Sequence, residues 1–139
     1  MRVLFDTNIV LDLLLDRQPF SEHASYLITM VERSEISGFL CATTVTTIYC
    51  LLTKGLDKKK AKASVNTLTA LFEIAAVNRL VIEKALSSKF NDFEDSVLHE
   101  SARHAGLEYI ITRNIKDFKH AQIPAFTPIE FLNMLEALG

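Results

Sequence analysis

Short apolar runs alternate with longer segments of helical spacing, and this alternation restricts the fold more than any other feature of the chain. The run RVLF (residues 2–5) has no polar alternation, which is typical of a strand buried on both faces. Three further runs are predicted as strands, at residues 36–42, 73–77 and 107–112. Two helical segments separate each strand from the next. Strands interleaved with helices predict a parallel sheet that helices cover on both faces.

Residues that start or stop helices bound the helical segments. We predict helices over residues 8–17, 21–35, 43–55, 57–72, 78–88, 92–106 and 127–138. The expected boundary residues are Pro19 after the first helix, Ser21, Thr43 and Thr127 as N-caps, Pro128 at the first helical position, and Gly55 and Gly106 as C-terminal stops. Residues 113–124 are expected to be irregular.

Composition indicates an ordinary soluble globular protein. A chain of 139 residues with 49% hydrophobic and 23% charged residues suits one domain, residues 1–139. No apolar stretch approaches the roughly 20 residues of a membrane span, and a secretory signal is not expected. Cys41 and Cys50 lie in apolar runs, so we interpret them as reduced core residues of a cytoplasmic protein; a disulfide between them is the weaker interpretation.

Acidic and amide side chains cluster where predicted strands end and where one helix begins. In parallel α/β sheets, ligands bind beyond the carboxyl ends of the strands. Three distant segments are therefore expected to deliver side chains to one edge of the sheet. They are Asp6 after the first strand, Asp92, Glu94 and Asp95 at the start of the helix that leads to the last strand, and Asn114 and Asp117 after that strand.

Each of these residues also has a structural explanation when it is taken alone. Asp6 can cap the helix that begins at Asn8. Asp92 and Asp95 have the spacing of an N-cap and its N3 partner. Asn and Asp residues that follow a strand can merely shape a turn.

Taken together, the acids indicate a cation site. Carboxylates that share one edge raise each other's pKa or require a cation. Oxygen ligands alone suit Mg²⁺ or Mn²⁺, and no His or Cys spacing indicates zinc. A divalent ion in such a site can bind a phosphate oxygen and activate water for phosphodiester hydrolysis. The net charge of −2 gives no general attraction to nucleic acid, so an RNA partner would need a local basic patch or bound cations.

Three motifs together resemble the PIN domain family, which includes the bacterial VapC-type toxin ribonucleases. They are LFDTNIVLDLLLDR, DFEDSVLHESARHAG and YIITRNIKDF, and the resemblance extends from Arg2 to the helix that begins TPIEFL. It implies a three-layer α/β sandwich with a central parallel sheet of four to five strands. It also implies endonucleolytic cleavage of RNA with Mg²⁺ or Mn²⁺ as cofactor, in the toxin half of a toxin–antitoxin pair, with an antitoxin and a second copy of the chain as candidate partners.

The resemblance assigns roles to individual positions. Asp6, Asp95 and Asp117 match the family's metal-binding and catalytic acids, and Asn114 belongs to the polar pair of the last motif. Asp92 or Glu94 is expected to assist in holding metal. Thr7 and Asn8 match the small polar residues beside the first acid. Asn8 either orients a ligand or water or only begins the helix.

One departure from the family pattern raises an alternative. Many PIN ribonucleases carry a glutamate in the helix after the second strand, whereas the segment TTVTTIYCLL has no acid and places Tyr49 or Cys50 at that position. Neither is a good Mg²⁺ ligand. The alternative is a degenerate PIN domain that binds RNA or protein without cutting. A receiver-type phosphoacceptor is disfavoured because no convincing lysine follows a late strand.

Several other polar residues have two open interpretations. Arg113 and Lys116 are expected to steer phosphates, although Arg113 could instead pair with an acid of the same edge. His99 is either a proton shuttle or, more commonly for such a position, a partly exposed helical histidine. Lysines 58–62 form a solvated helix start or contact RNA. Asp12 and Asp16 are expected to face water or to cap neighbouring groups.

Overall fold

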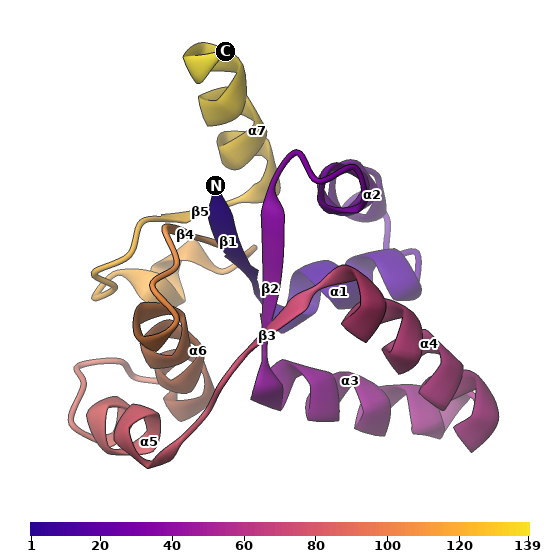
Figure 1. Ribbon diagram of the computed structural model, residues 1–139, viewed down its shortest axis with the longest axis horizontal. Coiled ribbons are helices and arrows are strands. Elements are labelled where there is room, and N and C mark those ends of the chain that lie inside the picture. The colour runs from indigo at the N-terminus through magenta and orange to yellow at the C-terminus, as the bar shows by residue number, and fades with distance from the viewer.

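Five parallel strands form the central sheet in the computed structural model of residues 1–139, in the order β3-β2-β1-β4-β5 (Figure 1). The strands are β1 (Arg2–Phe5), β2 (Ser37–Cys41), β3 (Glu73–Ala75), β4 (Tyr109–Ile111) and β5 (Ala125–Phe126). The four strands expected from the sequence are all present. The fifth, β5, has two residues, too few to give a periodic signal.

Seven α-helices are present, as the sequence predicts. They are α1 (Thr7–Leu14), α2 (Ser21–Glu32), α3 (Ala42–Gly55), α4 (Lys58–Leu71), α5 (Arg79–Leu86), α6 (Phe93–His104) and α7 (Pro128–Leu138), with a 3-10 helix η1 (Ile115–Phe118) after β4. Helix α1 ends earlier than predicted, because the chain leaves it through Asp16 at a φ of 47°.

Some of the predicted helix boundaries are confirmed. Thr127 caps α7 in a capping box with Glu130, directly before Pro128. Gly106 follows α6 at a φ of 71°, which a residue without a Cβ adopts freely.

The N-caps predicted for α2 and α3 are wrong. Phe20 and Cys41 occupy the cap positions, and neither forms a side-chain cap hydrogen bond. The Ser21 hydroxyl instead donates to Asp16 Oδ1 at 2.8 Å. The Thr43 hydroxyl lies 3.2 Å from Cys41 Sγ, so both hydroxyl groups contact side chains that precede their helices rather than capping the helices.

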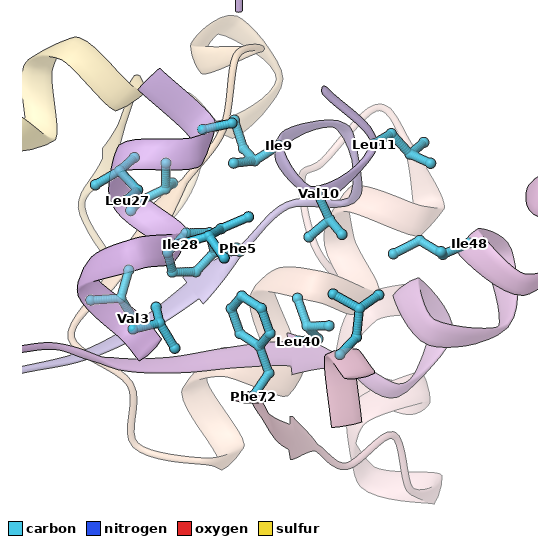
Figure 2. Close-up of a cluster of buried hydrophobic side chains, with 14 of the residues drawn as sticks. Val3, Phe5, Ile9, Val10, Leu11, Leu27, Ile28, Leu40, Ile48 and Phe72 are labelled. Atoms are coloured by element: carbon cyan, nitrogen blue, oxygen red, sulfur yellow. The ribbon is translucent and has the colours of Figure 1, made fainter. Parts of the chain in front are cut away.

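The two faces of the sheet carry separate cores, as a three-layer sandwich requires. Val3 and Phe5 project into the core formed with α1, α2, α3, α4 and α7, part of which Figure 2 shows. Leu4, between them in β1, projects into the opposite core, formed mainly with α5 and α6. Figure 1 shows α5 and α6 on the side of the sheet opposite α1 to α4.

The two cysteines differ in their surroundings. Both have free thiols, and Cys41 is buried in the core on the α5–α6 side. Cys50 is exposed on α3, so its interpretation as a core residue is wrong.

The order of the strands places a topological switch beside β1. The chain proceeds from β1 outward through β2 to β3, then returns through α5 and α6 to β4 on the other side of β1. Connections therefore leave the carboxyl ends of β1 and β4 in opposite directions, and ligands of open α/β sheets bind where this occurs. None of the helices combines the length and the hydrophobicity that a membrane-spanning helix requires.

Close packing at Gly38 generates a prediction about stability. A Cβ at this position of β2 would lie 2.7 Å from Phe72 Cε1 and 2.8 Å from Val31 Cγ2. Because both neighbours are buried, we expect Gly38→Ala to lower the free energy of unfolding by about 1–3 kcal/mol in urea denaturation. Gly55→Ala is the matched control, since a Cβ added at Gly55 would have no neighbouring atom within 4 Å. Equal stabilities of the two variants would contradict this account.

Candidate active site

Asp6 lies at the switch point between β1 and β4. Its backbone N–H donates to the Ile111 carbonyl at 2.9 Å, which extends the pairing of the two strands by one residue. Its side chain is only 6% exposed and is the N-cap of α1, accepting a hydrogen bond from Thr7 N–H. The capping interpretation of Asp6 is therefore confirmed. Its second oxygen accepts a hydrogen bond of 2.7 Å from the Thr112 hydroxyl.

Two threonines without a role predicted from the sequence form hydrogen bonds at this end of the sheet, Thr112 with Asp6 and Thr44 with its neighbour Thr7. Thr112, fully buried after β4, also accepts a hydrogen bond from Asn114 N–H at 3.0 Å and thereby connects Asp6 to the last motif. Thr44, at the start of α3, shares a hydrogen bond of 2.9 Å with the Thr7 hydroxyl. A polar residue directly after a buried strand was the available signal for Thr112. The Thr112 hydroxyl and the Thr7 N–H together hold the Asp6 carboxylate in one orientation.

Helix α6 brings a second group of acids to the same edge. Asp92 is its N-cap and accepts a hydrogen bond from Asp95 N–H at 2.9 Å, so the capping interpretation is confirmed for Asp92. The helix is fixed in place by Ser96, which donates to the Ala85 carbonyl, and by Ser101, which donates to the Ala76 carbonyl. Its first turn also carries Glu94, which is exposed, and Asp95, which is half-buried.

The pKa values indicate that acids from all three segments act on one another. The pKa of Asp95 is raised to about 7, first by burial and then by the negative charges of Asp6, Asp92, Asp117 and Glu94. Burial also raises the pKa of Asp6, against the hydrogen bonds from Thr112 and Thr7, and the Asp117 charge adds to the rise. We call the five residues Asp6, Asp92, Glu94, Asp95 and Asp117 the acidic edge.

The acidic edge suits a hard dication in charge and ligand type. All of its potential ligand atoms are carboxylate oxygens. A bound cation would offset the electrostatic repulsion between these carboxylates. As the side chains lie, no three His, Cys, Asp or Glu residues stand close enough together to hold an ion. Helix α3 adds no acid: Tyr49 is half-buried against the core, and Cys50 is exposed.

Residues of the last motif lie at the surface beside these acids. Asn114 occupies the N-cap position of η1 without a side-chain cap bond, and Lys116 and Asp117 are exposed in η1. Asn8 Oδ1 is the one buried side-chain N or O atom without a hydrogen-bond partner. Because an unpaired buried acceptor costs free energy, this atom favours the ligand-orienting interpretation of Asn8.

Arg113 forms an ion pair, but with an acid outside the acidic edge. Its Nε and Nη2 donate to Asp12 at 2.7 and 3.1 Å, and its guanidinium lies 4.0 Å from the centre of the Phe20 ring. Asp12 is 1% exposed, so the expectation that it faces water is wrong. Asp16 does contact neighbouring polar groups, Gln18 and Ser21, as expected.

His99 is 2% exposed, which corrects the expectation of a partly exposed histidine. Its Nε2 accepts a hydrogen bond from Gln122 N–H at 2.9 Å, so Nδ1 carries the proton and donates to Glu100 Oε2 at 3.1 Å. Burial lowers the pKa of His99 against the attraction of the Glu100 carboxylate. Both ring nitrogens are engaged, which leaves neither free to carry protons for the acidic edge.

Comparison with known proteins decides the family. A family model described as the PIN domain matches residues 2–116. The chain belongs to the PIN domain family. Among curated relatives, this PIN domain is 26% identical over 135 residues to Ribonuclease VapC1 of Aquifex aeolicus (strain VF5), covering 94% of this chain and 92% of that protein.

Solved structures share the fold of this PIN domain. A structure of FitAB bound to an IR36 DNA fragment matches with a TM-score of 0.71 at 19% identity, covering 91% of this chain and 94% of that chain. A toxin–antitoxin complex from Klebsiella pneumoniae matches with a TM-score of 0.67 at 24% identity, covering 91% and 97%. FitAcB from Neisseria gonorrhoeae matches with a TM-score of 0.69 at 21% identity, covering 91% and 98%.

The raised pKa of Asp95 predicts how stability depends on pH. Between its usual pKa near 4 and its folded value of about 7, the folded protein binds more protons at Asp95 than the unfolded chain does. Stability without metal therefore falls as pH rises through this interval. We expect Asp95→Asn to remove that fall, so that in EDTA its melting temperature exceeds that of the wild type by a margin that widens from pH 5 to pH 8. Parallel melting curves across this range would contradict the coupling.

The buried Asp12 carboxylate predicts a large stability difference between two acids of the same segment. We expect Asp12→Asn to lower the free energy of unfolding by about 3 kcal/mol, because the partly buried Arg113 guanidinium loses its charged partner. Asp16→Asn is the control, expected within about 0.5 kcal/mol of wild type, since Asp16 is exposed and Asn tolerates a positive φ. Urea denaturation measures the free energy of unfolding of both variants. If Asp12→Asn lowered it as little as Asp16→Asn does, the structural role of the Asp12–Arg113 pair would be refuted.

Proposed function

We propose that this PIN domain is a metal-dependent endoribonuclease, the toxin of a toxin–antitoxin pair. The observation that carries the proposal is the mutual electrostatic influence of Asp6, Asp95 and Asp117 at the switch point of the sheet. The likeness to a protein named Ribonuclease VapC1 supports the activity. Neighbours described as toxin–antitoxin complexes support a protein partner.

The acidic edge would hold Mg²⁺ or Mn²⁺. Asp6, Asp95 and Asp117 are the proposed catalytic ligands, with Asn114 and either Asp92 or Glu94 assisting. When bound, such an ion supplies a Lewis acid for a phosphate oxygen and lowers the pKa of water. No covalent nucleophile of the protein is required.

The surrounding residues prepare Asp6 for this role. Thr112 and Thr7 donate to its two carboxylate oxygens and fix the orientation of the group before a ligand arrives. Preorganised groups do not have to reorganise when the reaction occurs. Asp95, with a pKa of about 7, holds its proton in part of the molecules near neutral pH and releases it when a cation binds.

Three polar residues beside the acidic edge would bind the substrate. Lys116 is exposed in η1 and free to contact a phosphate. Arg113 keeps part of its guanidinium at the surface while Asp12 orients it. Asn8 would orient a water beside the substrate, since a water can donate a hydrogen bond to its unpaired oxygen. The partners proposed are RNA, an antitoxin protein and a second copy of the chain.

Replacing Asp6 tests the activity. We expect Asp6→Asn to reduce RNA cleavage in Mn²⁺ or Mg²⁺ by at least about 100-fold, because the central ligand loses its charge. The fold should survive, since the asparagine oxygen can still accept from Thr7 N–H. Cleavage of a labelled single-stranded RNA, with circular dichroism melting, measures both effects.

Glu136→Gln is the matched control for this variant, because Glu136 is exposed on α7, far along the chain from the acidic edge. It should cut RNA at the wild-type rate. An Asp6→Asn protein that cuts as fast as this control would overturn the proposal.

The missing acid in α3 favours one second candidate, a PIN domain that binds RNA or protein without cutting. Metal titration separates the two functions. For the nuclease, Mn²⁺ at about 100 times its Kd should stabilise the folded protein by about 2.7 kcal/mol. No stabilisation and no cleavage would favour the binding module.

A further inference from the structure

A second charged site lies one helical turn along α6 from Asp95. It is a groove of about 530 Å³ between α5, α6 and the segment that joins η1 to β5, a size typical of ligand sites. We call it the basic groove, and its polar lining includes Lys84, Ser87, Lys89, Arg103, His120 and Gln122.

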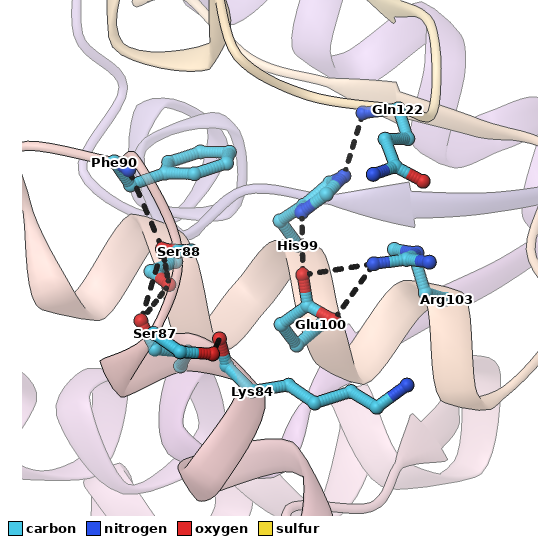
Figure 3. A network of polar contacts seen from close by, with 10 residues as sticks. Lys84, Ser87, Ser88, Phe90, His99, Glu100, Arg103 and Gln122 are labelled. Carbon is cyan, nitrogen blue, oxygen red and sulfur yellow. Dashed lines mark hydrogen bonds and ion pairs between the residues drawn. The ribbon is translucent and has the colours of Figure 1, made fainter.

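The one carboxylate in the basic groove is already neutralised. Glu100 is 5% exposed and accepts hydrogen bonds from Arg103 Nη1 at 3.1 and 3.3 Å and from His99 Nδ1 at 3.1 Å (Figure 3). The Glu100–Arg103 pair adds no net charge to the groove. It also fixes the Arg103 guanidinium on the groove wall, which is the kind of preorganised donor that phosphate recognition uses.

The two lysines of the basic groove lack acidic partners. The ion pairs of the protein involve neither Lys84 nor Lys89. In Figure 3 no hydrogen bond or ion pair joins the side chain of Lys84 to Glu100. The groove therefore carries uncompensated positive charge in a protein whose net charge is −2.

The basic groove adjoins the acidic edge through two shared segments. Phe90 stacks on His99 at 4.9 Å and meets the edge of Phe118 at 5.7 Å. Phe90 precedes the acidic edge residue Asp92 by two positions, and Phe118 directly follows Asp117 in η1. An extended ligand that leaves the acidic edge and follows α6, such as an RNA strand, thus reaches the basic groove without crossing the sheet.

We propose that the basic groove binds the phosphodiester backbone of the RNA strand, a few nucleotides from the bond that is cut. This inference rests on the proposed function. The five carboxylates of the acidic edge repel a polyanion wherever no cation stands between them, so the strand needs positive contacts nearby. Lys84 and Lys89 supply them, and the hydroxyl groups and the amide of the lining supply uncharged donors.

RNA binding by a non-cutting protein tests the groove. On the Asp6→Asn background, the double variant Lys84→Gln/Lys89→Gln is compared with Arg33→Gln/Lys54→Gln. The second pair removes the same charge from exposed positions at the carboxyl ends of α2 and α3, neither of which has been assigned a contact with RNA. Fluorescence anisotropy with single-stranded RNAs of about 12 and about 3 nucleotides measures affinity over a range of salt concentrations.

We expect the groove variant to bind the longer RNA roughly tenfold more weakly at low salt. The slope of log affinity against log salt should fall in magnitude by about 1.4, which is two phosphate contacts at roughly 0.7 each. The short RNA, which spans only the acidic edge, should bind both variants equally. The Arg33/Lys54 variant should keep its affinity for both RNAs, and all the proteins should melt at one temperature.

Two results would overturn the groove while leaving the proposed function intact. One is unchanged affinity and salt slope in the groove variant. The other is an equal loss in the Arg33/Lys54 variant, which would indicate general charge attraction. Failure of the proposed function is measured separately, as absence of RNA cleavage by the wild-type chain in Mn²⁺. Weaker binding of the longer RNA by the groove variant on the Asp6→Asn background would still support the basic groove in that case.

Discussion

A desolvated carboxylate at the end of the central strand is the constraint on which the rest of this structure depends. Asp6 is buried where β1 and β4 part, and burial without partners would cost several kcal/mol. The chain satisfies it with Thr7 N–H and with the hydroxyl of Thr112, from a segment 106 residues away. The same hydrogen bonds that make the carboxylate tolerable in the fold also hold it facing the acids of α6 and η1.

Periodicity and strand-end rules predicted the parts of the fold and site that local sequence determines. Buried parallel strands are recognisable as apolar runs, and the rule that ligands bind at their carboxyl ends predicted the position of the acidic edge from the sequence alone. Thr127 was readable as a cap because both members of its capping box lie within four residues. The roles of the acids as metal ligands stay predictions.

Residues with distant partners could not be read in the same way. Asp12 looked solvent-exposed because its partner, Arg113, follows 101 residues later. His99 looked like a surface histidine because the backbone of Gln122, which covers it, belongs to a segment without regular structure. Ser21 has the sequence signature of a cap, but its hydroxyl is used by Asp16, whose positive φ leaves no local signal.

The distribution of charge links the two sites. The acidic edge concentrates negative charge at one end of α6, while unpaired lysines face the basic groove beside the same helix. A cation at the first site and a phosphate chain across both would neutralise the two ends together. On this account, binding of metal and binding of RNA reinforce each other. The net charge of the protein is small because the negative charge at the acidic edge and the positive charge elsewhere, including the basic groove, nearly cancel.

The most direct test of the central claim is paramagnetic broadening of backbone amide signals by substoichiometric Mn²⁺ in an NMR spectrum of the wild-type protein. If the acids jointly hold one hard dication, the amides of Thr7, Asp95 and Asp117 should broaden together at the lowest Mn²⁺ concentrations and recover when Mg²⁺ is added in excess. Broadening that begins at unrelated exposed acids such as Glu32 or Glu136, with Thr7 and Asp95 unaffected, would contradict it.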